Sequence, residues 1–259
     1  MILPSLSKKG LSIEPSVTLA IDAKAKSMIS SGENVISFSI GEPDFNTPKN
    51  IREAGIEAIE KGITKYTPAS GTLELRKSIC KKFKDDNNLD YSPSQIVVSN
   101  GGKHSIYNAL MAILNPLDEV IFSIPYWVSY PELVSIAGGK PVMIKTKEQN
   151  GFKFSPEDLD KVKTDKTKAI IINSPNNPTG SVYTKEELSD IAKWAVKNDV
   201  FVISDELYEK LVYDGEEHIS IASLNDEIKN LTIVINGMSK AYSMTGWRIG
   251  YAAANQDIA

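Results

Sequence analysis

The sequence predicts an α/β fold, in which a mostly parallel central sheet is covered by helices on both faces as a three-layer αβα sandwich. Two observations predict it. Segments with strand patterns and segments with helix patterns alternate along the 259 residues. Several strand segments, among them 200–204 and 231–235, are nearly continuous apolar runs, which are typical of strands covered on both faces. Ligands of such sheets bind at the carboxyl ends of the strands, so site residues are expected there.

The first half of the chain begins with a predicted helix over 16–31 and a predicted strand over 35–40. Thr47 and Pro48 have the pattern of a helix cap followed by a first-turn proline, so the next helix is expected to begin there and to reach Gly62. The elements that follow are an amphipathic helix over 72–87, a strand over 96–99, a helix over 103–114 and a strand over 119–124.

The second half continues this alternation. Thr184 and Glu187 form a capping box, which predicts a helix start, and this helix is expected to reach Lys197. The other elements are a helix near 127–137, a strand over 141–145, a short helix opened by residues 155–158, strands over 169–172, 200–204 and 231–235, and a last strand before residue 255.

Composition limits the classes of function. The formal net charge is −4, with 41% hydrophobic and 24% charged residues, as in ordinary globular proteins. This negative balance argues against nucleic-acid binding, so an anionic ligand needs a local cationic pocket. Cys80 is the only cysteine, which excludes a disulfide within the chain. Because no apolar run approaches the ~20 residues of a membrane span and no signal peptide is recognised, no membrane partner and a cytoplasmic location are expected.

Lys240 follows closely on the apolar run 231–235. Burial disfavours the ammonium form and lowers the pKa of a lysine, so a lysine at the mouth of a sheet is a candidate amine nucleophile for Schiff-base chemistry. For any single lysine the alternative is a solvated surface charge. Other motifs in the sequence are needed to distinguish a nucleophilic lysine from a surface lysine.

Residues 99–103 place two glycines, Gly101 and Gly102, between a strand and a helix start. Glycines there let backbone N–H groups approach an anion at the positive end of the helix, which is the pattern of a phosphate cradle. An ordinary tight turn is the alternative. The spacing is neither that of a dinucleotide-binding fingerprint nor that of a P-loop.

Asn177 lies in a loop, 173–180, that is rich in turn-forming residues and follows a predicted strand. The loop either turns the chain or presents the Asn177 amide to a ligand oxygen. Asp205 stands where the strand over 200–204 emerges from the sheet. A carboxylate there needs a cationic partner, such as a protonated ring nitrogen, to remain ionised; a helix cap is the alternative.

Taken together, these clusters resemble those of the fold-type I, pyridoxal-phosphate-dependent aminotransferases of class I/II, and within them the aspartate aminotransferase branch. The resemblance covers nearly the whole chain. It depends on these motifs in this order: Gly41-Glu42-Pro43-Asp44-Phe45, Lys65-Tyr66, Gly101-Gly102-Lys103, Pro125-Tyr126-Trp127, Asn176-Asn177-Pro178-Thr179-Gly180, Asp205-Glu206-Leu207-Tyr208, and Ser239-Lys240 with Gly246-Trp247-Arg248-Ile249-Gly250-Tyr251.

The resemblance implies a role for each site residue and implies no metal. Lys240 would be the Schiff-base lysine and proton shuttle, with Asp205 on the pyridine nitrogen and Tyr208 on the ring oxygen O3′. The residues implied to bind pyridoxal 5′-phosphate are Gly101, Gly102, Lys103, Trp127, Asn177, Asp205, Tyr208, Ser239, Lys240, Arg248 and, from the other subunit of a homodimer, Tyr66. Those implied to bind substrate are Gly41, Thr18, Lys103, Trp127 and Asn177.

The implied reaction is ping-pong transamination of aspartate with 2-oxoglutarate to oxaloacetate and glutamate. Lys103 at a helix start opposes the helix dipole, so an anionic substrate group nearby would relieve its placement. Members that also accept prephenate carry a basic residue where this chain has Glu14, so prephenate is not expected. The alternatives are an alanine or aromatic aminotransferase, a cysteine-conjugate β-lyase, the sensor domain of a transcription regulator, and an inactive fragment that only binds the cofactor.

Two departures from the family pattern shape the expected domains. Gly237 stands where the family often has a serine that binds the cofactor phosphate. The chain also stops before the family's carboxylate-binding arginine. We therefore expect a C-terminally truncated sequence, in which residues 1–45 form an N-terminal segment of a mostly missing small domain and of a substrate-side lid. Residues 46–259 are expected to form the cofactor-binding large domain, incomplete at its C-terminus.

Overall fold

A seven-stranded sheet organises the second of two compact units in the computed structural model, which describes residues 5–11 and 13–259. The units are Met1–Phe45 and Asn46–Ala259. The strand order is β1-β7-β6-β5-β4-β2-β3. The strands are β1 (Ile96–Ser99), β2 (Glu119–Ile124), β3 (Lys140–Lys145), β4 (Thr167–Asn173), β5 (Phe201–Asp205), β6 (Thr232–Gly237) and β7 (Gly250–Ala253).

The predicted mostly parallel sheet is confirmed. Strands β2 to β6 pair in parallel, whereas β7 is antiparallel to both of its neighbours, β1 and β6. The antiparallel pairing of β7 brings Gly250 opposite both Ser99 and Gly237. Three segments that are distant in sequence therefore meet at one point of the sheet edge where β6 ends.

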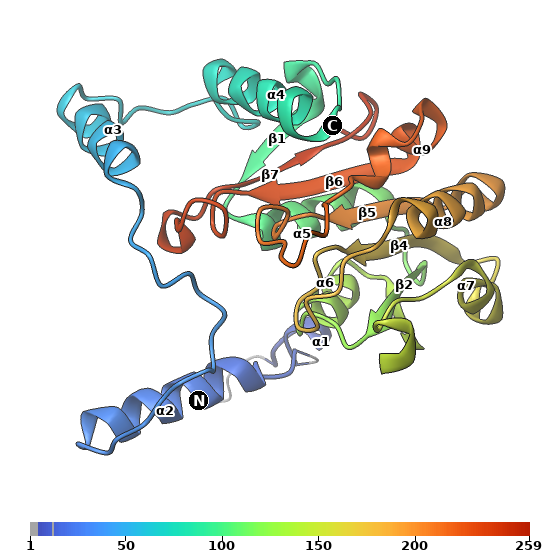
Figure 1. The fold of residues 1–259 in the computed structure, drawn as a ribbon, viewed down its shortest axis with the longest axis horizontal. Coiled ribbons are helices and arrows are strands. Elements are labelled where there is room, and N and C mark those ends of the chain that lie inside the picture. Colours follow the sequence, from blue (N-terminus) through green and yellow to red (C-terminus); the bar gives the residue numbers. More distant parts are fainter. Residues whose placement is uncertain (1–4, 12) are drawn as a thin grey trace. The chain divides into compact units, whose positions relative to one another are not determined.

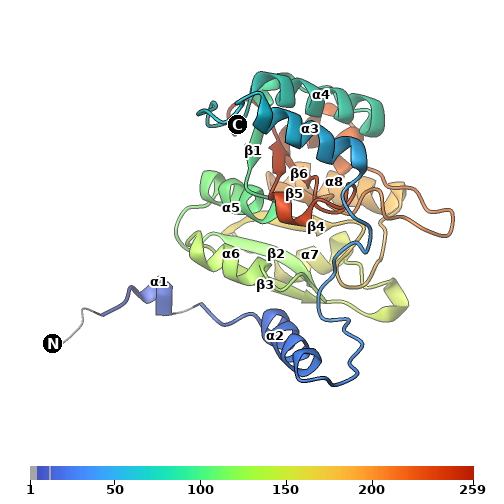
Figure 2. The ribbon, with the colours of Figure 1, turned by 90° about the vertical axis from the view of Figure 1, so that its left-hand side faces the viewer.

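Helices cover both faces of this sheet (Figures 1 and 2). On one face, α5 and α6 pack on side chains such as Ile171, Ile203 and Ile235. On the other, α7, α8 and α9 pack on Ile170 and Val202, and α4 packs beside them on β7. The helices of this unit are α3 (Lys49–Glu60), α4 (Leu73–Asn87), α5 (Gly102–Ile113), α6 (Tyr130–Ile136), α7 (Pro156–Val162), α8 (Lys185–Asn198) and α9 (Asp226–Leu231), with 3-10 turns η1 (Pro93–Gln95), η2 (Glu148–Asn150), η3 (Ile221–Ser223) and η4 (Thr245–Trp247).

Local capping explains why several helices begin where the sequence predicts. At α8 the capping box is present, because Thr184 accepts from the backbone N–H of Glu187 at 3.2 Å and Glu187 accepts from that of Thr184 at 2.8 Å. The predicted cap of α3 is wrong by one residue. Pro48 takes the cap position, and the Thr47 hydroxyl donates instead to the carbonyl oxygen of Ser243 at 2.6 Å. The Thr47 hydroxyl thus makes a tertiary hydrogen bond in place of the predicted helix cap.

The first unit contains α1 (Lys8–Leu11), α2 (Val17–Ser30) and an irregular segment after them. The helix prediction over 16–31 is confirmed, with Ser16 as the cap. The strand prediction over 35–40 is wrong, because the backbone there is irregular and Phe38 is 95% exposed. A strand needs a neighbour to satisfy its backbone hydrogen bonds, and the described residues of this unit offer none. Across residues 5–11 and 13–259, no helix is both long enough and apolar enough to span a membrane.

Candidate active site

Asn177, Asp205, Tyr208 and Lys240 lie at or follow the ends of β4, β5 and β6. Asn173, the last residue of β4, is in register with Asp205, the last residue of β5. Asp205 is in turn in register with Ile235 on β6. The loop that carries Asn177, the turn that carries Tyr208 and the segment that carries Lys240 all leave the sheet from these neighbouring ends, as parallel strands require.

Asp205 is a buried carboxylate that accepts hydrogen bonds from neutral groups. It is 3% exposed, and its Oδ2 accepts a hydrogen bond from the Tyr130 hydroxyl at 2.6 Å. Among residues 5–11 and 13–259, Oδ1 has only a long contact of 3.4 Å with the backbone N–H of Leu207. Burial raises the pKa of Asp205 to about 6, although the Tyr130 hydrogen bond acts against this rise. A cation brought to this carboxylate would restore its charge and lower its pKa again.

Three more predicted side chains meet beside this carboxylate. The Asn177 Nδ2 donates to the Tyr208 hydroxyl at 3.3 Å, and the Lys240 Nζ lies 5.5 Å from the centroid of the Tyr208 ring. Asn177 is held in turn by Asn173, whose Oδ1 accepts from the Asn177 backbone N–H at 2.7 Å. Burial, followed by the charge of Asp205, raises the pKa of Tyr208 to about 12, so its phenol is protonated at neutral pH.

Trp127 connects this group to the start of α5. The Lys103 Nζ lies 5.2 Å from the centroid of the Trp127 ring. The Trp127 ring meets Tyr130 edge-on, with centroids 5.4 Å apart and planes at 87°. Trp127 therefore contacts the residue that binds Asp205, and its flat, half-buried ring is available to stack on a planar ligand.

Close backbone contacts at the start of α5 form a cradle next to Arg248. Gly101 has φ +85° and ψ 164°, a conformation that is essentially restricted to glycine. A Cβ on Gly101 would lie 2.2 Å from the Arg248 Nη2. Arg248 is itself held by two carbonyl oxygens, that of Thr245 at 2.8 Å and that of Asn100 at 3.4 Å. A guanidinium beside a helix N-terminus is suited to binding a phosphate.

Gly250 is expected to be indispensable to this cradle. In the variant Gly250→Ala, the new Cβ would lie 2.3 Å from both Gly101 C and Gly102 N, which are backbone atoms that side-chain rotation cannot move. We expect a loss of about 3 kcal/mol in the free energy of unfolding, measured by urea denaturation. The matched control is Gly246→Ala, because no atom lies within 4 Å of the Cβ position there. Equal stability of the two variants would contradict the close packing.

The remaining predicted residues differ in their burial and in the unit to which they belong. Ser239 is buried next to Lys240. Gly237 has no room for the serine that the family often carries there, because a Cβ would lie 2.9 Å from the carbonyl oxygen of Ile249. Tyr66 is fully exposed, and its predicted role in a second subunit stays a prediction. Thr18 and Gly41 belong to the first unit, so their roles also stay predictions.

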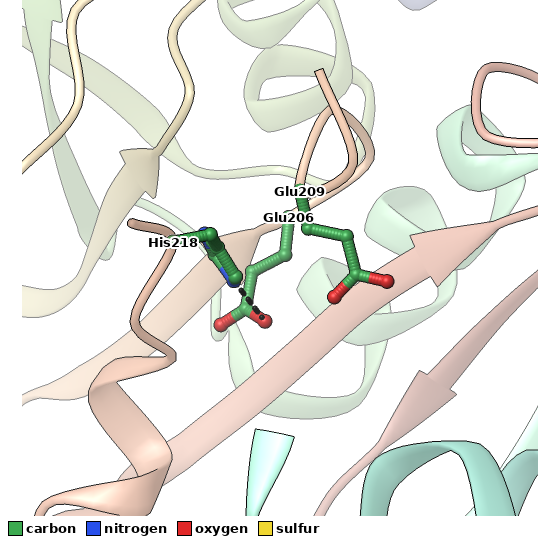
Figure 3. Close-up of side chains that lie close together, drawn as sticks. All are labelled: Glu206, Glu209 and His218. Carbon is green, nitrogen blue, oxygen red and sulfur yellow. Dashed lines mark hydrogen bonds and ion pairs between the residues drawn. The ribbon is translucent and has the colours of Figure 1, made fainter. Parts of the chain in front are cut away.

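A buried charged network that no sequence motif predicts adjoins Asp205 (Figure 3). Glu206 accepts hydrogen bonds from Ser204 at 2.9 Å and Ser220 at 2.6 Å, and it pairs with the His218 Nε2 at 3.1 Å. Burial raises the pKa of Glu206, but the His218 charge and these hydrogen bonds lower it overall. No local pattern marks a residue twelve positions away as the partner of a glutamate.

Glu206, Glu209 and His218 also bring potential metal-ligand atoms within 4.8 Å of one another (Figure 3). Their charges are already compensated within the protein. Glu209 forms an ion pair with Lys82 and accepts from the Asn87 Nδ2 at 2.9 Å. We therefore interpret this cluster as an ion-pair network that supports the turn after β5.

An α/β sheet with a lysine, an acid and a glycine turn beside an arginine near its strand ends fits a cofactor-dependent transferase. The chain belongs to the class I and II aminotransferases, because residues 33–259 match the model of that family. Members of this family use pyridoxal 5′-phosphate. Both the predicted family and the predicted cofactor are thereby confirmed.

Particular relatives are aspartate aminotransferases. Those of Bacillus sp. (strain YM-2) and Bacillus subtilis (strain 168) are 56% and 54% identical over 253 residues, which are 98% of this chain and 64% of each relative. The solved structure of the Thermus thermophilus aspartate aminotransferase with maleate matches with a TM-score of 0.95 at 43% identity, over 99% of this chain and 66% of that one. This chain thus spans slightly less than two thirds of the length of these relatives.

Proposed function

We propose that the protein is a pyridoxal-phosphate-dependent aminotransferase that transfers an amino group from aspartate to 2-oxoglutarate by a ping-pong mechanism. The observation that carries this proposal is the grouping of Lys240, Tyr208 and Asn177 beside the buried Asp205. Family membership supports it, and so do the names of the relatives.

The residues present fit the cofactor. The cradle at Gly101 and Gly102, together with Arg248, would hold the phosphate, because the missing side chain of Gly101 lets the Arg248 guanidinium lie against the start of α5. Asp205 would face the ring nitrogen. The protonated nitrogen would be the cation that offsets the cost of ionising this buried carboxylate. Trp127 would stack on the ring. When bound, the cofactor supplies an electron sink for the electron pair left at the substrate α-carbon.

The protein side chains would bind the ring and move the proton. The Lys240 Nζ would attach covalently to the cofactor and, once released by the amino substrate, would carry the proton away from the substrate α-carbon. Tyr208 would donate its hydroxyl hydrogen to the ring oxygen, because its pKa of about 12 keeps the phenol protonated. Asn177 supports Tyr208 through the 3.3 Å hydrogen bond and would reach the same oxygen.

The position of Lys103 supports the proposal that the substrate is a dicarboxylic amino acid. It is exposed at the N-terminus of α5, and its Nζ lies 5.2 Å from the Trp127 ring centroid. A carboxylate placed there would interact with both the ammonium and the positive end of the helix. The Thermus thermophilus relative was solved with maleate, which is a dicarboxylate. Thr18 and Gly41 belong to the first unit, and their predicted roles in substrate binding stay predictions.

Half-reactions with single amino acids test the substrate. The chain is loaded with pyridoxal 5′-phosphate and mixed with aspartate, alanine or phenylalanine, and the cofactor absorbance is followed. We expect aspartate to react fastest, and Lys103→Gln to reduce its rate relative to alanine by about tenfold or more, as for the loss of a charged hydrogen bond. Faster reaction with alanine or phenylalanine would overturn the substrate assignment.

The same samples separate the alternatives. Release of pyruvate and ammonia from cysteine conjugates would favour the β-lyase, and cofactor binding without amino transfer would favour the binding-only fragment. Our proposal also includes a homodimer, to which the fully exposed Tyr66 would contribute across the subunit boundary. Sedimentation of the loaded sample should therefore give a dimer, and a monomer at all concentrations would contradict that part of the proposal.

A further inference from the structure

We infer that Tyr130 is a positioning residue, whose hydroxyl holds the Asp205 carboxylate, favours its ionised form and leaves its second oxygen for the cofactor ring. This inference rests on the proposed function for its meaning, but its geometry is independent of any ligand. Tyr130 is the first residue of α6, and Asp205 is the last residue of β5. The contact joins residues 75 positions apart in the sequence.

The hydrogen bond between them is short and buried. The Tyr130 hydroxyl donates to the Asp205 Oδ2 at 2.6 Å, and the two residues are 2% and 3% exposed. Short O–H···O⁻ bonds of this kind stabilise the charged form of a carboxylate, and low dielectric strengthens them. Within the described part of the chain, Oδ1 has only its 3.4 Å contact with the Leu207 backbone N–H, so it is the less engaged oxygen and the one that we assign to an incoming cation.

Aromatic neighbours hold the Tyr130 ring in place. Its centroid lies 5.4 Å from that of Trp127 and 5.8 Å from that of Phe122. Its backbone N–H also donates to the carbonyl oxygen of Trp127 at 3.0 Å. The ring predicted to stack on the cofactor and the carboxylate predicted to pair with the ring nitrogen are therefore connected through one tyrosine. Movement of the Trp127 ring would therefore shift Tyr130 and change its hydrogen bond to Asp205.

The groups near Asp205 act on its ionised form in both directions. Glu206, directly after it, is ionised and raises the pKa of Asp205. Tyr208 is a protonated phenol whose hydroxyl bonds to Asn177. The hydroxyl of Tyr130 and, more weakly, the backbone N–H of Leu207 act in the opposite direction. Removing the Tyr130 hydroxyl should therefore shift Asp205 toward its neutral form.

The variant Tyr130→Phe tests this inference without the cofactor. In apoprotein with ¹³C-labelled aspartate, the carboxyl shift of Asp205 is followed against pH and assigned with Asp205→Asn. We expect its pKa to rise by about one unit or more, the effect of losing a hydrogen bond to a charged group. The matched control is Tyr91→Phe, because the Tyr91 hydroxyl is also buried and lacks a hydrogen-bond partner within the described part of the chain.

An unchanged pKa in Tyr130→Phe, or an equal rise in Tyr91→Phe, would overturn the inference. If Tyr130→Phe does not fold, Tyr130→His restores an N–H donor and should give a pKa nearer to that of the wild type; a pKa at or above the value expected for the lost hydroxyl would count against the inference. With pyridoxal 5′-phosphate, Tyr130→Phe should lose affinity near neutral pH and recover it at higher pH, where Asp205 ionises. Failure of every protein to bind the cofactor would overturn the proposed function, while the apoprotein titration would still decide the role of Tyr130.

Discussion

Replacing Lys240 with alanine is expected to abolish amino transfer, with a fall in kcat/KM of at least about 10⁴-fold. The reason is that one amine would perform two tasks, covalent attachment of the cofactor and proton transfer at the substrate α-carbon, and residues that act in this way lose nearly all activity when removed. The position of Lys240 beside the Tyr208 ring, at the end of β6, places the amine with the other site residues.

Two measurements check this result. The visible absorption of the lysine-bound cofactor should be lost in Lys240→Ala, and borohydride treatment should no longer fix the cofactor to the protein. The control is Lys193→Ala, because that lysine is 77% exposed and pairs with Asp190 on the surface of α8. If Lys240→Ala kept the absorption band, or kept more than about a hundredth of the wild-type rate, the proposed role of Lys240 would be wrong.

Asp205→Asn should have opposite effects on stability and on activity. Burial raises the pKa of Asp205 from 3.8 to about 6, so its ionisation costs folding free energy. The folded state binds the Asp205 proton more tightly than the unfolded state. Ionisation of Asp205 therefore lowers the free energy of unfolding of the apoprotein as pH rises from about 4 to about 6. At 1.36 kcal/mol per pKa unit, the cost above pH 6 is about 3 kcal/mol.

Asparagine removes this cost and keeps an oxygen for the Tyr130 hydroxyl. We therefore expect the apoprotein variant to be more stable than the wild type at pH 8, with a difference that disappears near pH 3.5, as measured by urea denaturation at both pH values. Amino transfer should fall by about 10³-fold, because the amide does not balance a charged ring nitrogen. A variant that is less stable at pH 8, or fully active, would contradict this account; Asp190→Asn, at an exposed position, is the control.

Much of the fold follows from local patterns. Alternation of strand and helix segments, the apolar runs of β4 to β6 and the capping box of α8 depend on neighbours in sequence, and the structure agrees with each of them. The errors occur where a distant partner decides. The segment over 35–40 has strand composition but no partner strand among the described residues, and Thr47 uses its hydroxyl on Ser243 rather than on the start of α3. The antiparallel β7 was not foreseen for the same reason.

For the site, local patterns are enough to show which side chains are present and that several of them follow strand ends. The environment that controls their chemistry depends on the tertiary structure. The pKa of Asp205 depends on burial and on Tyr130, 75 residues away, and the cradle beside Arg248 depends on the contact of Gly250 with Gly101. Desolvation and close packing act through space, so residues distant in sequence determine them, and no local pattern reveals their partners.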